Sequence, residues 1–339
     1  MGWHFNCGAG HRRGGGSLLA TGQEMMELAT QSVIETVDLS KTYNGITAVD
    51  KLNLRIEEGE IFGFLGPNGA GKSTTILMLL GLTEPTSGVA RICGYNSARE
   101  PLKVKRISGY VPERVGFYED LTARANLAYT AGLNGLSEEL ATKRIKEALG
   151  IVGLLPVADR EVGTFSRGME QRLAIADILI KAPRVAFLDE PTTGIDPEGV
   201  KEMLDLISRI AREQQMTVVL SSHQLPYVQR ICSHVGIISR GRMVVEGPLD
   251  QLGREALAGG RFMIELQLAE TTSELVDCVK KIDGVVSVER QGDLLVVGCT
   301  EDLRPQIAKA IVEANGLLVQ MKIQSYALED IYMKYFTEG

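Results

Sequence analysis

Residues 66–74 read GPNGAGKST, and this stretch decides the fold. It matches the pattern G-x-x-x-x-G-K-[ST], which arises by chance in roughly one chain in a hundred of this length. The apolar run IFGFLG (61–66) leads into it, and KSTTILMLLGL (72–82) follows with the composition of a helix. A buried strand, a glycine-rich loop and a helix in this order predict an α/β unit that binds phosphate.

The residue types of the loop explain why it suits a nucleotide. Gly66, Gly69 and Gly71 allow the backbone to curl until its N–H groups face inward, and the start of the helix adds partial positive charge. Lys72 is expected to reach the β- and γ-phosphates of ATP, and the Ser73 hydroxyl to ligate Mg²⁺. The predicted nucleotide-binding segment is Gly66, Pro67, Asn68, Gly69, Ala70, Gly71, Lys72, Ser73 and Thr74.

A second apolar run, VAFLDEPTTGIDP (185–197), places two adjacent carboxylates at the end of a predicted strand. Ligands of open parallel sheets bind at the carboxyl ends of the strands. Asp189 is therefore predicted as a partner of Mg²⁺, and Glu190 as the general base that polarises an attacking water. A third run, TVVLSSH (217–223), ends in His223. We expect its strand to lie beside the other two and His223 to contact the γ-phosphate.

Composition limits the classes of function. The 339 residues are enough for two domains, and 44% of them are apolar. The net charge of −7 argues against a large surface for duplex DNA, so no nucleic-acid partner is expected. The five cysteines are scattered and form no CxxC pair, which favours a reducing cytosol over a zinc or disulfide framework. No apolar run approaches the roughly 20 residues of a membrane span, so a membrane role requires a partner.

The pattern along the chain predicts three regions. Residues 1–32 are glycine-rich without periodicity and are expected to be a disordered extension. Residues 33–247 read as an α/β nucleotide-binding domain with a mostly parallel sheet and a helical subdomain at about 118–180. It begins with VIETVDLS (33–40), which alternates like an edge strand. Residues 258–339 predict a small α+β domain of ferredoxin-like βαββαβ order, with a hairpin turn at 291–293 and an apolar last helix.

With these motifs in place, residues 33–245 resemble the ATPase subunits of ABC transporters. The segment FSRGMEQR (165–172) is similar to the family signature L-S-G-G-Q, FLDEP to the Walker B strand, and GID (194–196) to the D-loop. His223 corresponds to the H-loop histidine. Tyr43 in KTYNG corresponds to the aromatic residue that stacks on adenine, with an ordinary strand tyrosine as the alternative interpretation.

Two motifs, the signature and the Q-loop, depart from the family pattern. Arg167 stands where the signature usually has glycine, and Met169 where it usually has glutamine. In GYVPERVGFYEDLT (109–122), Glu113 replaces the usual Q-loop glutamine. A carboxylate there is able to ligate Mg²⁺ but donates no amide hydrogen bond. The segment GYVPE…FYEDLT and the small C-terminal domain together resemble a subgroup of export-type systems with separate permease chains.

The resemblance implies how the protein works. Two ATPase subunits, identical or related, would pack head to tail on the cytoplasmic face of the membrane beside a permease. Each ATP would lie between one phosphate loop and the other subunit's signature, with Ser166, Gly168 and the D-loop Asp196 taking part. The C-terminal domain is expected to regulate the ATPase, to strengthen the dimer or to support the cassette, and its apolar last helix to dock the twin subunit. The alternatives are a soluble ABC-type ATPase without a permease and a P-loop GTPase or kinase.

Overall fold

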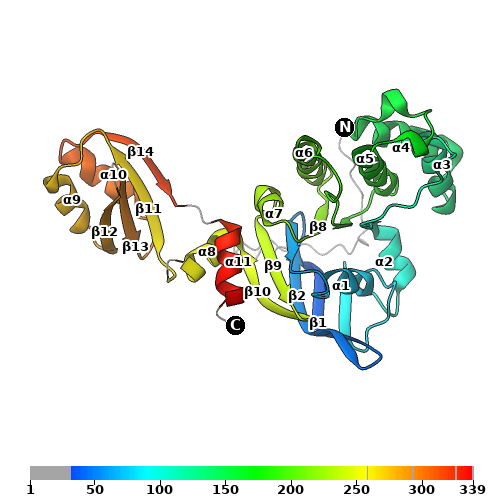
Figure 1. Ribbon diagram of the computed structural model, residues 1–339, viewed down its shortest axis with the longest axis horizontal. Helices are drawn as coiled ribbons and strands as arrows, with labels where there is room; N and C mark the ends of the chain where they lie inside the picture. Colours follow the sequence, from blue (N-terminus) through cyan, green and yellow to red (C-terminus); the bar gives the residue numbers. More distant parts are fainter. Residues whose placement is uncertain (1–31, 258, 292–293, 325–326, 338–339) are drawn as a thin grey trace, which may run out of the picture. The chain divides into compact units, whose positions relative to one another are not determined.

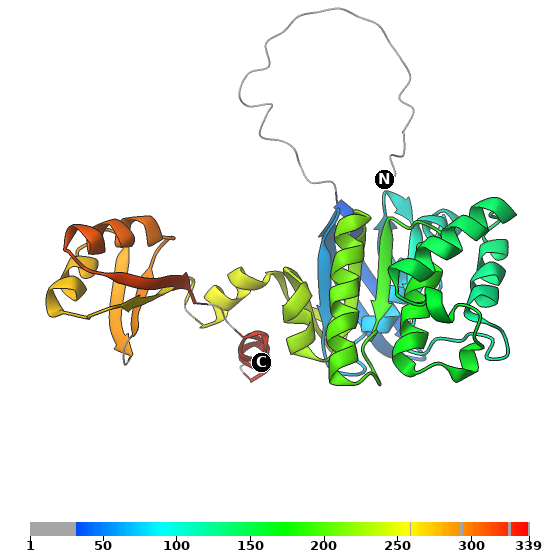
Figure 2. The ribbon, with the colours of Figure 1, turned by 90° about the horizontal axis from the view of Figure 1, so that it is seen from above.

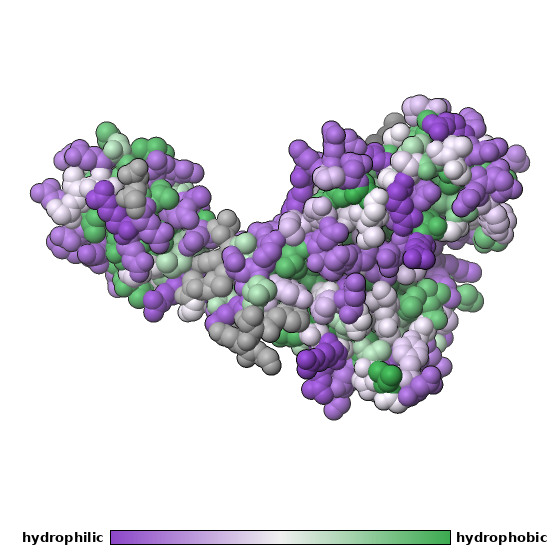
Figure 3. Space-filling model, in the orientation of Figure 1, coloured by the Kyte–Doolittle hydropathy of each residue, from purple (hydrophilic) through white to green (hydrophobic). Residues whose placement is uncertain are grey.

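The computed structural model describes residues 32–257, 259–291, 294–324 and 327–337 (Figure 1). Of the N-terminal extension expected at 1–32, only Ser32 falls in this part, and residues 292–293 of the expected hairpin turn also lie outside it. Within the described residues, no helix is both long enough and apolar enough to cross a bilayer. The face drawn in Figure 3 is mostly polar, and its apolar residues form small separate patches.

A six-stranded sheet forms the centre of residues 33–247, with the order β10-β9-β3-β8-β7-β6. Its neighbours pair in parallel except β10 and β9, which confirms the predicted, mostly parallel sheet. β8 lies between β3 and β7, as expected, so the phosphate loop, Asp189 and His223 follow strands that end at one edge. The strands are β3 Ile61–Leu65, β6 Ser108–Val111, β7 Val185–Asp189, β8 Thr217–Ser222, β9 His234–Ser239 and β10 Arg242–Pro248.

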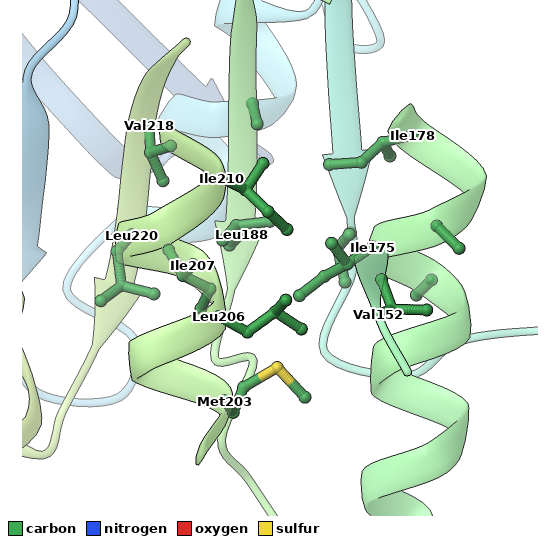
Figure 4. Packing of buried hydrophobic residues seen from close by; sticks show 14 of the residues in the cluster. Val152, Ile175, Ile178, Leu188, Met203, Leu206, Ile207, Ile210, Val218 and Leu220 are labelled. Atoms are coloured by element: carbon green, nitrogen blue, oxygen red, sulfur yellow. The ribbon is translucent and has the colours of Figure 1, made fainter. Parts of the chain in front are cut away.

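Both faces of this sheet are buried, which explains the continuous apolar runs of its strands. Leu188 of β7 and Leu220 of β8 face α6 (Pro197–Glu213) and α5 (Arg167–Leu179), as Figure 4 shows. Phe187 of β7 points to the opposite face and joins a second apolar cluster with Phe62 and Phe64 of β3. The other helices of the domain are α1 Lys72–Leu79, α2 Pro101–Ile107, α3 Ala123–Leu133, α4 Glu138–Ile151 and α7 Leu225–Ile231.

A four-stranded antiparallel sheet of order β2-β1-β4-β5 covers this second cluster. Its strands are β1 Ser32–Tyr43, β2 Ile46–Glu57, β4 Ser87–Ile92 and β5 Tyr95–Asn96. The prediction of an edge strand at 33–40 is wrong, because β1 pairs with both β2 and β4. The alternating pattern shows only that one face is buried, and an inner strand of an antiparallel sheet satisfies it equally well.

The C-terminal part has the βαββαβ order that the sequence predicts. Its sheet has the order β12-β13-β11-β14, all antiparallel, with α9 and α10 on one face (Figure 2). Ile264, Leu266, Val297 and Ile307 are among the fully buried residues of its separate core. The elements are β11 Phe262–Leu268, α9 Ser273–Lys280, β12 Val285–Gln291, β13 Leu294–Cys299, α10 Arg304–Glu313 and β14 Leu318–Ile323.

The last helix, α11 (Leu328–Thr337), packs on the same chain, against α8 (Leu249–Leu257) and α7. Leu328 and Ile331 are completely buried in the apolar cluster that also contains Leu188 and Leu220, with Tyr332 and Tyr335 packed against it. The Leu328 N–H donates a hydrogen bond of 2.9 Å to Oε1 of Gln229 in α7. The expectation that this apolar stripe docks a twin subunit is therefore wrong, because the stripe is covered within its own chain.

Candidate functional site

The phosphate loop runs from β3 to α1 and depends on three glycines with positive φ, namely 154° at Gly66, 78° at Gly69 and 109° at Gly71. Two of them also lack room for a side chain. A Cβ on Gly66 would lie 2.3 Å from the carbonyl oxygen of Ile238, and one on Gly71 would lie 2.6 Å from that of Ala48. The loop is thus pressed between β9 and β2 in a conformation that only glycine adopts without strain.

Lys72 is the first residue of α1 and is only 6% exposed. Its ammonium group folds back onto the loop and donates hydrogen bonds to the carbonyl oxygens of Gly66 at 2.7 Å and Pro67 at 3.3 Å. Burial lowers the pKa of Lys72, and the carboxylates of Glu190 and Asp189 oppose that lowering. These carbonyls hold the charge inside the loop, where an entering phosphate is able to replace them.

Asp189 ends β7 and Glu190 follows it, and both are more than 90% buried. Ser221 of β8 positions both residues. Its hydroxyl donates a hydrogen bond to Oδ1 of Asp189. The Glu190 N–H donates in turn to Oγ and to the carbonyl oxygen of Ser221, each at 3.2 Å. Glu190 has a φ of +50°, a conformation that costs free energy for a residue with a side chain. The sequence singles out Ser221 only by its place two residues before His223.

The Glu190 carboxylate lies between two cationic or titratable partners. Its Oε1 is 3.8 Å from Nζ of Lys72 and 2.9 Å from Nδ1 of His223. Its Oε2 is buried and has no hydrogen-bond partner among the described residues. An unpaired, buried carboxylate oxygen is costly for stability, and such an atom is placed to accept a hydrogen bond from a water or ligand that enters the site.

The proposed cation ligands are oxygen donors of the kind that Mg²⁺ prefers. Ser73 is exposed at the start of α1, and Asp189 ends the buried strand β7, which is separated from β3 by β8. The carboxylate of Glu113 is exposed, and its charge, with those of Glu190 and Asp189, opposes the lowering of the Lys72 pKa by burial. Across the described part of the chain, no three His, Cys, Asp or Glu side chains converge into a metal site. A cation held here would take its remaining ligands from phosphate oxygens and water, as Mg²⁺ commonly does.

The signature segment lies at the start of α5. Ser166 is the N-cap of this helix, and its exposed Oγ accepts a hydrogen bond of 3.4 Å from the Met169 N–H. Gly168 is open, since an added Cβ would meet nothing nearer than Ile195 at 3.7 Å. In the described residues, no hydrogen bond joins Ser166 or Gly168 to the phosphate loop of the same chain. Asp196 caps the neighbouring helix α6 by accepting from the Gly199 N–H at 2.9 Å.

Arg167, the residue that departs from the signature, connects three segments. Its guanidinium donates to the carbonyl oxygen of Glu113 and forms an ion pair of 3.1 Å with Glu170. Its aliphatic part packs over Gly194, whose Cβ position lies 3.4 Å from Cγ of Arg167. Gln171 Nε2 donates to the same Glu113 carbonyl at 3.5 Å. Arg167 and Glu113, which depart from the signature and from the Q-loop, therefore meet at one contact.

Tyr43 stands at the end of β1, beside the Asn44-Gly45 turn that joins it to β2. Its side chain is 44% exposed, and Nζ of Lys41 lies 4.9 Å from the ring centroid. A tyrosine at a half-exposed hairpin end is available for stacking, so the adenine role predicted for it fits this placement.

The fold and this loop define a P-loop nucleotide-binding protein. Comparison with known proteins narrows the class. The family described as "ABC transporter" matches residues 49–193. The bacitracin transport ATP-binding protein BcrA of Bacillus licheniformis is 39% identical over 309 residues, which cover 91% of this chain and 98% of BcrA. The daunorubicin/doxorubicin resistance ATP-binding protein DrrA of Streptomyces peucetius is 33% identical, covering 87% of this chain and 88% of DrrA.

A solved structure supports the same family. The dimeric structure of MJ0796, a bacterial ABC transporter cassette, is 28% identical with a TM-score of 0.59, covering 64% of this chain and 98% of that one. The chain belongs to the ATP-binding subunits of the ABC transporter family, whose members hydrolyse ATP.

Proposed function

We propose that this chain binds ATP with Mg²⁺ at residues 66–74 and hydrolyses it within a head-to-tail dimer, formed with a second copy or a related subunit. The dimer contacts a separate membrane permease on the cytoplasmic face of the membrane. Hydrolysis drives export through this permease. The observation that carries the proposal is the Glu190 carboxylate. One of its oxygens is held by His223 and Lys72, while the other is buried without a partner.

The chemistry follows from the positions of these groups. Glu190 accepts a proton from a water that hydrogen-bonds to its free Oε2, while His223 keeps the carboxylate in place through Oε1. Lys72 moves its ammonium group from the Gly66 and Pro67 carbonyls to the phosphates. The N–H groups of the loop and of the start of α1 stabilise the negative charge that accumulates on the phosphate oxygens.

The residues at the edge of the sheet suit a divalent cation, with the Ser73 hydroxyl and the Asp189 carboxylate as its protein ligands. When bound, Mg²⁺ would neutralise part of the negative charge of the phosphates. Ser221 keeps Asp189 oriented by donating its hydroxyl hydrogen to Oδ1. Glu113, an exposed carboxylate in the segment that follows β6, is proposed as a further ligand.

The second half of the site comes from another chain. Ser166 and Gly168 are open at the N-terminus of α5, where the partial positive charge favours a phosphate. The Ser166 hydroxyl accepts from its own helix, so its hydrogen is free to donate to a ligand. A nucleotide bound to one phosphate loop and to this helix of a twin would link two chains, and its hydrolysis would release them.

The direction of transport is inferred from the relatives, whose names describe bacitracin transport and daunorubicin/doxorubicin resistance. The names of these relatives, which describe ATP-binding proteins of transport and resistance systems, support a separate permease as the partner. A soluble ATPase without a permease has no support from them.

Substitution of Glu190 by Gln tests the proposed base. The amide keeps the shape of the side chain but accepts no proton, so we expect phosphate release to fall by about 10²–10⁴-fold while ATP binding is retained. Glu213→Gln, at the exposed end of α6, is the matched control and should keep full turnover. Release of phosphate by E190Q at a near-normal rate would rule out this assignment.

A further inference from the structure

Arg167 stands between the two signature residues that are proposed to contact phosphate. Ser166, the N-cap of α5, precedes it, and Gly168, which has open space at its Cα, follows it. A phosphate held by both neighbours would fix the backbone on each side of Arg167. The position of the Arg167 side chain therefore depends on whether this half of the site holds a nucleotide.

The Arg167 side chain contacts two other motifs of its own chain. Its Nη2 atom donates to the carbonyl oxygen of Glu113, in the segment that follows β6. Its Cγ atom lies 3.4 Å from the Cβ position of Gly194, which starts the predicted D-loop. An ion pair of 3.1 Å with Glu170, one turn further along α5, keeps the guanidinium in this place. A movement of Arg167 would thus reach both segments.

The Glu113 carbonyl oxygen has a second and weaker donor on the same helix. Gln171 is completely buried, and its Nε2 atom lies 3.5 Å from this oxygen. That distance is longer than the roughly 2.7–3.2 Å that is usual for an N–H···O bond. The Oε1 atom of Gln171 is buried and has no hydrogen-bond partner among the described residues. Arg167 therefore supplies most of the attachment between Glu113 and α5.

Glu113 in turn belongs to the nucleotide site of its own chain. The charge of its carboxylate acts on Lys72, as do the charges of Glu190 and Asp189. Arg167 thus connects the half-site that the chain offers to a twin with the half-site at its own phosphate loop. Two binding sites that are connected in this way change each other's affinity by the same factor, whichever of them is filled first.

We propose that Arg167 is a positioning residue that couples the two nucleotides of the dimer, an inference that rests on the proposed function. ATP on the twin's phosphate loop orders Ser166 and Gly168, and Arg167 then holds Glu113 against α5 in its own chain. By the same contact, ATP on the chain's own loop favours the ordered signature. The first ATP thus raises the affinity for the second, and without Arg167 the two sites act more independently.

Amide hydrogen exchange in mixed dimers tests this coupling. One chain carries Lys72→Ala, so that only its signature meets ATP, and isotopic labelling separates its peptides by mass. The other carries Ser166→Arg and Glu190→Gln, so that it binds ATP without hydrolysing it. ATP with Mg²⁺ should slow exchange at residues 113–118 of the Lys72→Ala chain by at least about fivefold. Adding Arg167→Ala to that chain should remove most of this slowing, and Arg167→Lys, which keeps a cationic donor, should retain part of it.

Arg124→Ala is the matched control, because it removes an exposed arginine ion pair of the same helical subdomain and should leave the ATP-dependent slowing unchanged. In chains with no other substitution, turnover against ATP concentration should give a Hill coefficient above 1, which Arg167→Ala lowers towards 1. If mixed dimers form with ATP and the slowing is absent, or is equal with and without Arg167, the coupling is refuted while the proposed function stands. If ATP forms no dimers, both are refuted.

Discussion

Arg167 offers the most informative single substitution, because a glycine is usual at its position in the family signature. Its guanidinium donates to the Glu113 carbonyl oxygen, and its side chain is 30% exposed. A hydrogen bond from a charged group is worth about 1.5–3 kcal/mol when buried, and partial exposure reduces this. The ion pair with Glu170 adds less than about 1 kcal/mol, since that carboxylate is 32% exposed. We therefore expect Arg167→Ala to cost about 1–2 kcal/mol.

The loss should be local, because Arg167 holds the loop that begins at Glu113. A cost of about 1–2 kcal/mol corresponds to a roughly 5–30-fold increase in the open population of this segment. Amide hydrogen exchange at residues 113–118 should accelerate by that factor. ATP turnover should change by less than about tenfold, since Arg167 contacts neither Lys72 nor Glu190 in the described structure.

The matched control is Arg124→Ala, which removes an exposed ion pair with Asp159 in the same helical subdomain. It should leave exchange at residues 113–118 unchanged. Equal exchange in the wild-type chain and in Arg167→Ala would refute the reasoning, because the contact with Glu113 would then not hold the loop. Loss of turnover by several orders of magnitude would also contradict it, since it would make Arg167 a catalytic residue.

Two further predictions concern the rest of the chain. Ile331→Ala removes a fully buried side chain of α11 and should lower the free energy of unfolding by roughly 2–4 kcal/mol in urea titrations. Val312→Ala, 64% exposed on α10, should cost far less, and equal effects would show that α11 does not pack on the cassette. His234 Nδ1 lies 3.5 Å from Glu60 Oε1, and the hydrogen bond with Glu60 raises the pKa of His234 above its usual 6.5. For Glu60, burial raises the pKa, but bonds from His234 and the Glu57 N–H lower it overall. The stability contributed by the pair is thus largest between about pH 4.5 and 6.5 and is lost as pH rises through the raised pKa of His234 or falls through the lowered pKa of Glu60. The stability difference between the wild-type chain and His234→Asn should follow this profile in urea titrations across pH, and a flat difference would contradict it.

The sequence was informative where a local pattern determines a local structure. The glycines of residues 66–71, the buried strand that ends at Asp189 and the βαββαβ order of the C-terminal part all follow from short-range patterns. The position of β8 between β3 and β7 followed from the usual connections of parallel strands. The fold of the cassette was thus predictable, apart from the inner position of β1.

Contacts between distant residues were not predictable. Ser221 bonds to residues 31 and 32 positions earlier, and Arg167 to a carbonyl 54 positions earlier. The packing of α11 depends on α7, whose Gln229 lies 99 positions before Leu328. An apolar stripe shows that a face is buried, but not which surface covers it. On sequence grounds the twin subunit was therefore an acceptable partner for α11. In the structure, α7 and α8 of the same chain cover this helix instead.

Mixing two inactive variants tests the shared site most directly. Lys72→Ala disables the phosphate loop and leaves the signature intact, while Ser166→Arg blocks the signature and leaves the phosphate loop intact. In a head-to-tail dimer of one copy of each, one of the two sites combines both intact halves. The account predicts that each variant alone is inactive and that the mixture recovers ATP hydrolysis, up to about a quarter of the wild-type rate for random pairing of independent sites. A mixture that remains inactive while mixed dimers demonstrably form would show that each chain uses its own Ser166, contrary to the composite site.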